Sequence, residues 1–436
     1  MFHMKKFPFR VFLLIATLVT AAGCGEVRSG LPAAGEIDVR HLDVGPYSTE
    51  PIDTYKEYSH SVANGFESGI IRLTNHTATG LDIDPKLKFG TGTQSIAPLS
   101  MDTTANVSDV EKILSKAGAA AAVRNKVMFG FASGSSDHEP DRSGTSMPAA
   151  TLVTLGVMQF PTEADAARAA GEIEQADFDV ARDANRSVQL KNFPEAHSHW
   201  QPGTPTLGSL ISRSRYVVSL FVQVPDGGLP DIEALAEKAY AKQLPMLDAL
   251  PPLSASDAVK LDPDTDGMLR RIINPNKLYT PASGSLATYE EQGFLHFQND
   301  RAAAKSLFEA TRLDRFTVSD AYIPSAVDYS AAGNAQAFGK GIFKNATGGA
   351  ILYRSSGAAS AADAYSRLLE APDAHMSPKN VPDSKCAQLP DSGNYRQFSC
   401  AVRYHSFVAV VWGRQLDDAQ QRAAAQYALL ANSEWM

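Results

Sequence analysis

The fold is decided by a strand and helix pair that occurs twice, RSRYVVSLFVQV (213–224) with LPDIEALAEKAYAKQL (229–244), and CAVRYHSFVAVVWG (400–413) with LDDAQQRAAAQYALL (416–430). The first member of each pair shows the apolar alternation or the continuous apolar run of a β-strand. The second member has apolar residues near helical spacing, and its first Leu and its Tyr are equally far apart in both copies. A repeat period of roughly 190 residues predicts a duplicated domain rather than a solenoid.

Two further strand and helix pairs support the duplication. They are TLVTLGVMQF (151–160) with EADAARAAGEIEQA (163–176), and GAILYRSS (349–356) with AADAYSRLLEA (361–371). We therefore expect each half to be an α+β domain, with a mainly antiparallel sheet and helices packed on one face. A ferredoxin-like arrangement is our specific expectation.

Composition predicts the boundaries between these parts. We assign residues 1–23 to a leader, 24–35 to a tether rich in Gly, Ala and Pro, 36–253 to the first domain, 254–268 to a linker and 269–436 to the second domain. A chain of this length is typical of two domains.

Cys24, directly after the leader, indicates where the protein is located. Lys5, Lys6 and Arg10 precede an apolar run over 11–22, which has the length of a signal-peptide core and is too short to span a bilayer. The string TAAGC that closes it resembles the bacterial lipobox, although Ala replaces the commoner Leu. The resemblance implies a diacylglyceryl group on the Cys24 thiol and cleavage in front of Cys24.

The charge of the mature chain excludes several kinds of partner. Removing the leader leaves 37 Lys and Arg against 48 Asp and Glu, a net charge of −11. An acidic exported chain is poorly suited to bind nucleic acid or to dock on anionic lipid by charge. We expect attachment to the membrane through acyl chains on Cys24, no nucleic-acid partner and no cofactor.

Two cysteines remain once Cys24 carries lipid. Outside the cytoplasm a disulfide between Cys386 and Cys400 would persist, and we expect it to join neighbouring strands of the second sheet. The first half has no cysteines at matching places, so the bond would be an added staple that the fold does not require. The alternative is a pair of free, buried thiols.

Four stretches resemble a known group of proteins. They are LDVGPYSTEP (42–51), GTSMPAATLVTLGVMQFP (144–161), LDPDTDGML (261–269) and SLATYEEQGFLHFQND (285–300). They look like stretches of actinobacterial surface lipoproteins of unknown function that carry two related α+β domains. The resemblance covers nearly the whole mature chain, and it implies surface location and architecture but no activity.

The segment GTSMP (144–148) is the first candidate for chemistry. It resembles the nucleophile segment of subtilases, which implies that Ser146 would be activated by His and Asp. The chain departs from that family because Pro directly follows Met and no HGT-type turn occurs. The nearest upstream histidines, His76 and His138, stand in NHT and DHE. The alternative is a polar loop that enters the following strand.

The run LDPDTDG is the second candidate. Three carboxylates alternate along it, those of Asp262, Asp264 and Asp266. The run begins like an EF-hand calcium loop, but Arg270 and Ile273 stand where that loop has a ligand and a bidentate Glu. Two alternatives remain, a calcium site of another kind and a turn-forming linker in which Asp caps a short helix at 267–273.

The third candidate is EAHSHW (195–200). His197 and His199 would share one face of an extended strand, a spacing found in zinc sites, with Glu195 as the third ligand. Trp200 makes a ligand groove an equal alternative. Histidines that bind no metal are the remaining interpretation.

No catalytic constellation emerges from these candidates, so we do not expect an enzyme. Our expectation is a membrane-anchored, extracytoplasmic lipoprotein that acts as a binding or scaffolding module for an envelope ligand or partner protein. The alternatives are an envelope serine hydrolase that uses Ser146 and a purely structural envelope protein.

Overall fold

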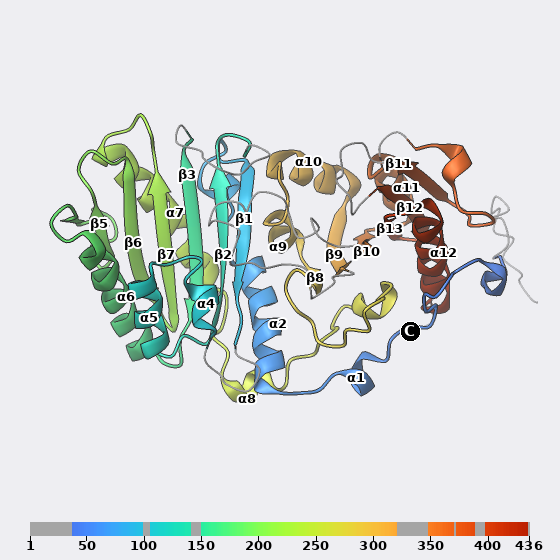
Figure 1. The fold of residues 1–436 in the computed structure, drawn as a ribbon, viewed down its shortest axis with the longest axis horizontal. Coiled ribbons are helices and arrows are strands. Elements are labelled where there is room, and N and C mark those ends of the chain that lie inside the picture. Colours follow the sequence, from blue (N-terminus) through green and yellow to red (C-terminus); the bar gives the residue numbers. More distant parts are fainter. Residues whose placement is uncertain are drawn as a thin grey trace, which may run out of the picture. The chain divides into compact units, whose positions relative to one another are not determined.

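Two antiparallel β-sheets, one in each half of the chain, form the framework of the protein (Figure 1). This computed structural model describes residues 37–98, 105–140, 150–320, 348–369, 372–388 and 397–434. The chain divides into two units, Met1–Asp38 and Val39–Met436, and both sheets belong to the second unit. Within the described residues, no helix has the length and apolar character needed to cross a membrane.

The first half is residues 54–253 and the second half is residues 254–434. The elements of the first half are α1 (Thr54–Glu57), α2 (Val62–Asn75), α3 (Gly80–Ile83), β1 (Phe89–Ile96), α4 (Val107–Val110), α5 (Lys116–Arg124), β2 (Phe129–Ser136), β3 (Leu152–Gln159), α6 (Glu163–Phe178), β4 (Arg186–Val188), β5 (His197–Trp200), β6 (Thr206–Arg213), β7 (Tyr216–Gln223) and α7 (Leu229–Asp248). Those of the second half are α8 (Ala255–Ala258), β8 (Leu286–Tyr289), α9 (Glu291–Leu295), α10 (Arg301–Thr311), β9 (Leu313–Asp320), β10 (Gly348–Ser355), α11 (Ala358–Arg367), β11 (Ser384–Gln388), β12 (Phe398–Tyr404), β13 (Phe407–Gly413) and α12 (Leu416–Asn432).

The strand order confirms the predicted duplication. The first sheet runs β1-β2-β3-β7-β6-β5-β4 and the second runs β8-β9-β10-β13-β12-β11. Each element from β1 to β7, except the short β4, therefore has a counterpart at the same position of the second sheet. Each sheet consists of two meanders that meet where β3 pairs with β7, or β10 with β13.

Two finer expectations differ from the structure. A ferredoxin-like sheet interleaves its strands through βαβ crossovers, whereas here the helix after β3 or β10 connects two complete meanders. Helices also cover both faces of each sheet and not one face. On β7, Val217 belongs to a hydrophobic cluster that includes residues of α5 and α6, while its neighbour Val218 belongs to another cluster that includes residues of α2 and α7. On β13, Trp412 clusters with α11 while Gly413 lies against α12.

A buried cation joins the two halves. Arg301, at the start of α10, is 0% exposed. Its guanidinium donates hydrogen bonds across to the first half, to Ser135 Oγ at 2.5 Å, Ser133 Oγ at 3.0 Å and the Gly134 carbonyl oxygen at 2.9 Å. Burial lowers the pKa of Arg301 to about 10, so the side chain remains charged at neutral pH.

Two more ionisable groups have strongly shifted pKa values. His296 is 1% exposed, and its Nε2 lies 3.0 Å from the Thr77 carbonyl oxygen. Burial, together with the charge of Arg301, lowers the pKa of His296 to about 3. Glu67 lies on α2, where burial and the charge of Asp109 raise the pKa of its carboxyl to about 7.

The second sheet contains the predicted disulfide. Cys386 of β11 and Cys400 of β12 are directly opposite each other and bonded, with their Cα atoms 4.0 Å apart. Both residues are 0% exposed. The bond closes a loop with a sequence separation of 14 residues, within a sheet that other strand pairs already hold together.

We predict that removing this bond destabilises the protein without changing its fold. The double replacement of Cys386 and Cys400 by Ala should lower the free energy of unfolding by about 3 kcal/mol, because the unfolded chain regains the entropy of the open loop. Urea unfolding followed by circular dichroism measures this loss. Wild-type protein denatured with a reductant is the control and should show the same stability as the variant. A variant that fails to form the native sheet would contradict the view that the bond is an added staple.

Candidate ligand-binding site

The two predicted histidines lie on β5, and the alternation of that strand decides where they point. His197 and His199 face α6, as their contacts with Gly171 and Glu174 of that helix establish. Ser198 faces the opposite side, where it belongs to a buried hydroxyl cluster that includes a Tyr of α7. Trp200 follows the same alternation as Ser198, so it does not form a groove with the two histidines.

His199 is held between two carboxylates of α6. Its Nδ1 lies 3.1 Å from Glu174 Oε1, and its Nε2 lies 3.8 Å from Asp177 Oδ2. Phe178 packs edge-on against the imidazole, with ring centroids 5.7 Å apart. Gly208 leaves room beneath the ring, since a Cβ there would lie 3.3 Å from Cε1 of the imidazole. The side chains of His199 and Glu174 are each 12% exposed, so the pair ties β5 to α6 at the rim of the protein.

A pocket of about 320 Å³ opens beside this pair, between α6 and the hairpin of β4 and β5. Its lining includes Glu174, Ser187, Gln189, Pro194, Ala196 and His197. None of its described lining residues is Lys or Arg. The lining thus offers a carboxylate, a hydroxyl, an amide and an imidazole, which together favour a neutral or cationic ligand that carries hydrogen-bond donors.

The candidate zinc site is not assembled by these residues. Over the described part of the chain, no group of three or more His, Cys, Asp or Glu is arranged to hold a metal ion. Glu195, the expected third ligand, is exposed and is not among the lining residues of the pocket. The carboxylate that does reach His199 belongs to Glu174, which packing of α6 brings into place.

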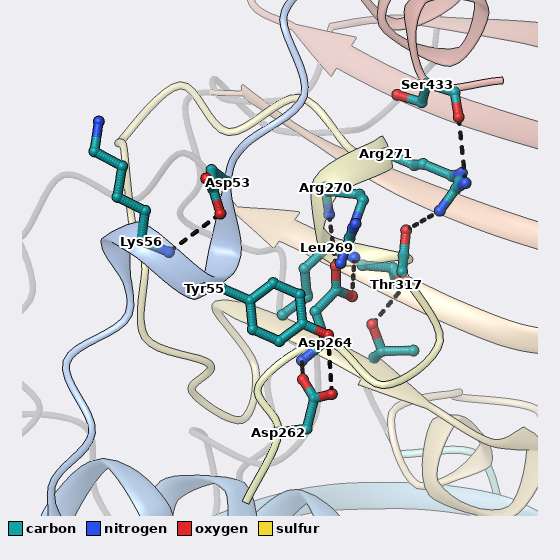
Figure 2. A network of polar contacts seen from close by, with 12 residues as sticks. Asp53, Tyr55, Lys56, Asp262, Asp264, Leu269, Arg270, Arg271, Thr317 and Ser433 are labelled. Carbon is teal, nitrogen blue, oxygen red and sulfur yellow. Dashed lines mark hydrogen bonds and ion pairs between the residues drawn. The ribbon is translucent and has the colours of Figure 1, made fainter. Parts of the chain in front are cut away.

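The acidic run LDPDTDG forms a different kind of site, shown in Figure 2. Asp264 is 4% exposed and accepts hydrogen bonds from the backbone N–H of Leu269 at 2.7 Å and of Arg270 at 3.2 Å. Arg270 Nε also pairs with this carboxylate at 3.1 Å. Burial raises the pKa of Asp264 because the removal of water outweighs these contacts. Asp264 therefore caps the 3-10 helix Leu269–Arg271, as the second alternative proposed, although this helix is shorter than expected.

The other two carboxylates of the run turn to separate partners. Asp262 accepts a hydrogen bond from the hydroxyl of Tyr55 at 3.1 Å, which Figure 2 also shows. Asp266 pairs with Arg315 Nε at 2.8 Å and lies 3.7 Å from a guanidinium nitrogen of Arg354. The three carboxylates thus do not converge on one point, and the calcium alternative has no ligand set here. The predicted linker is instead a packed segment that fixes the second half to α1.

The predicted lipidation site Cys24 and the alternative nucleophile Ser146 both lie outside the described residues. The histidines considered for Ser146 have local partners. His138 Nδ1 lies 2.6 Å from Asp137 Oδ1, and His76 Nδ1 lies 3.0 Å from the Arg72 carbonyl oxygen. Neither contact gives support to a catalytic triad.

Sequence reasoning missed the acidic side of the pocket. Glu174 and Asp177 stand three residues apart on a helix, a spacing that places them on one face. That spacing was visible, but nothing in the sequence indicated that this face of α6 would meet β5. Gln189 and Ser187 were also missed, because they have no pattern of their own.

Two family models match the chain. Residues 57–263 match the model described as "Domain of unknown function (DUF7373) N-terminal", and residues 268–433 match the corresponding C-terminal model. No curated protein matches the chain. Among solved structures, the extracellular domain of PknH from Mycobacterium tuberculosis is similar at 14% identity and a TM-score of 0.26, over 44% of this chain and 100% of that chain.

Proposed function

Because this chain carries both the N-terminal and the C-terminal domain of DUF7373, whose function is unknown, we propose a role from its own residues. The protein is an extracytoplasmic lipoprotein, anchored at Cys24, that binds a ligand or partner of the cell envelope and catalyses no reaction. The observation that carries the binding role is the polar pocket between α6 and the hairpin of β4 and β5.

Two features support an extracytoplasmic location. The leader ends in a segment that resembles a lipobox, as in the actinobacterial surface lipoproteins that the chain resembles. Cys386 and Cys400 form a disulfide, a bond that persists in oxidising compartments and is rare in the cytosol. The anchor would consist of two or three acyl chains, because a single chain gives only reversible binding.

The chemistry of the pocket supports a neutral or cationic ligand. Glu174 supplies an acceptor that already shares a contact with His199, so its second oxygen remains available to a ligand donor. The volume of about 320 Å³ is at the lower end of the range for small-molecule sites. A ligand of modest size, or one end of a larger envelope molecule, therefore fits best.

We predict that the mature protein, purified from an actinobacterial host, carries a stoichiometric ligand detectable as excess mass by native mass spectrometry. Glu174→Gln should lose most of that excess mass, because the amide carries no negative charge and replaces one of the two acceptor oxygens with a donor group. Glu111→Gln, at an exposed position away from the pocket, is the matched control and should retain it. A wild-type protein with no excess mass would contradict the proposal that it binds a small ligand. Equal loss of the excess mass in both variants would mean that the ligand does not bind in this pocket.

A further inference from the structure

The residues beside the pocket continue as a row across the first sheet. Residues directly opposite each other in an antiparallel sheet carry their side chains on the same face. Ser187 of the pocket lining is opposite His199, which in turn is opposite Gly208, and the pairing continues over three more strands. We call these residues the cross-strand row, and from β4 to β2 they are Ser187, His199, Gly208, Phe221, Thr154 and Gly134.

The helices on this face of the sheet cover only part of it. His199 contacts Glu174 and Asp177, so the cross-strand row lies on the face that α6 packs against. Val217 of β7 is on the same face and is 0% exposed, in the cluster that includes residues of α5 and α6. Phe221, four residues further along β7, is 42% exposed. In Figure 1, α5 and α6 lie over the lower part of these strands. Their cover of β7 therefore ends before Phe221.

Phe221 presents an apolar ring to solvent on an interior strand. β7 pairs with β6 along one edge and with β3 along the other. The residue opposite Phe221 on β6 is Gly208, which has no side chain. The His199 ring lies on the far side of Gly208, where a Cβ on Gly208 would be 3.3 Å from its Cε1. An apolar group of a ligand can therefore lie over the backbone at Gly208 and contact the Phe221 ring, which removes apolar surface of both from water.

Two different chemistries stand at the two ends of this stretch. Near the pocket, Glu174 and Asp177 flank His199, and the described lining of the pocket includes no Lys or Arg. The lining thus offers a carboxylate to a positively charged ligand group without a competing Lys or Arg. At the other end, the ring of Phe221 favours an apolar group. Three interstrand steps of about 4.8 Å separate β4 from β7, so the two ends are about 14 Å apart.

We propose that the ligand of the pocket is an elongated, amine-bearing amphiphile. Its ammonium group contacts Glu174 in the pocket, and its apolar part extends over Gly208 to the ring of Phe221. A compact ligand confined to the pocket would leave this ring in water. The inference rests on the proposed binding function and deepens it by naming the class of ligand.

Photolabelling of the full chain, purified in detergent, tests this proposal. The probe is aminohexyl-benzophenone, a primary amine joined through an alkyl chain to an apolar ketone that inserts into nearby C–H bonds on irradiation. Peptide mass spectrometry locates the label, and the probe concentration that gives half-maximal labelling measures the affinity. We expect saturable labelling of the peptide that contains β7. The N-acetylated probe, which has no charge, should need about tenfold more for the same labelling, because it loses the charge-assisted contact with Glu174.

Variants at the two ends assign the two contacts. Glu174→Gln and Phe221→Ala should each raise the half-maximal concentration about tenfold, the first by loss of charge and the second by loss of apolar contact. Phe221→Leu keeps an apolar side chain and should stay within about twofold of the wild type. Tyr279→Ala is the matched control, since this aromatic side chain of the second half is 37% exposed, and it should change nothing.

Three results would overturn the proposal. Labelling by the amine that depends on Glu174 but not on Phe221 would confine the ligand to the pocket. Equal labelling by the acetylated probe would rule out an ammonium group in the pocket. A wild type that is not labelled on β7 would rule out this class of ligand altogether. Each of these results leaves the proposed binding function to its own test, because the native mass of the purified protein reports a ligand of any class.

Discussion

Replacing Arg301 with Ala should lower the free energy of unfolding by about 4 kcal/mol. The guanidinium is fully buried and donates to two Ser hydroxyls and a backbone carbonyl oxygen of β2, as well as to the His296 carbonyl oxygen. Truncation leaves a cavity and removes the donor for these four acceptors at once. Because the acceptors on β2 belong to the first half, the loss also loosens the contact between halves. Guanidinium unfolding monitored by Trp fluorescence measures the effect.

Two variants separate the causes of this loss. Arg301→Met fills much of the volume but donates no hydrogen bond, so it should lose about 2 kcal/mol, since only the unpaired acceptors remain. Arg367→Ala removes a guanidinium that is 53% exposed and paired with Asp363, and it should lose less than about 1 kcal/mol. If Arg301→Met were as stable as the wild type, these hydrogen bonds would contribute nothing to joining the halves.

The second large effect is on the pH dependence of stability. As the pH falls, the contribution of His296 to stability decreases and that of Glu67 increases. Between pH 6.5 and about 3, His296 is protonated in the unfolded chain but neutral in the folded one. Its contribution therefore falls by about 1.4 kcal/mol for each unit of acidification. The pKa of Glu67 is about 7 in the folded protein and 4.5 in the unfolded chain. Between these two values the folded state binds more protons than the unfolded state. Acidification therefore raises the contribution of Glu67 to stability by about 1.4 kcal/mol for each pH unit.

Single variants reveal each contribution. As the pH falls from 6.5 to 4.5, the stability of the wild type relative to His296→Gln should decrease by about 3 kcal/mol. Relative to Glu67→Gln it should increase by a similar amount over the same range. Urea unfolding at half-unit steps of pH supplies both differences, in which the remaining titrating groups cancel. A constant difference for His296→Gln would mean that this imidazole is protonated in the folded protein.

The duplication and the strand and helix pairs were predictable because they depend on local periodicity. The continuous apolar run of β13 also indicated that both faces of this strand are covered. A strand that is buried on both faces has apolar residues at successive positions and not at every second position. The meander topology was not predictable, because pairing between β3 and β7 joins segments far apart in the sequence and depends on the packing of whole elements.

In the candidate site, too, the local pattern was predictable and the long-range packing was not. Alternation on β5 correctly placed His197 and His199 on one face. Their acidic neighbours could not be found, because Glu174 reaches His199 only through the docking of α6. Conversely, Arg270, at the ninth position of a calcium loop counted from Asp262, was visible in the sequence as a departure from that loop. In the structure that residue, Arg270, is the partner of Asp264.

We propose that lipid on Cys24 anchors this protein to the membrane on its extracytoplasmic side. Intact mass spectrometry of the protein extracted from the membrane fraction reads the mature N-terminus and its modification together. We expect a chain that begins at Cys24 and carries the mass of a diacylglyceryl group, with or without a further acyl chain. A chain that retains residues 1–23, or one that is cleaved elsewhere and carries no lipid, would contradict it.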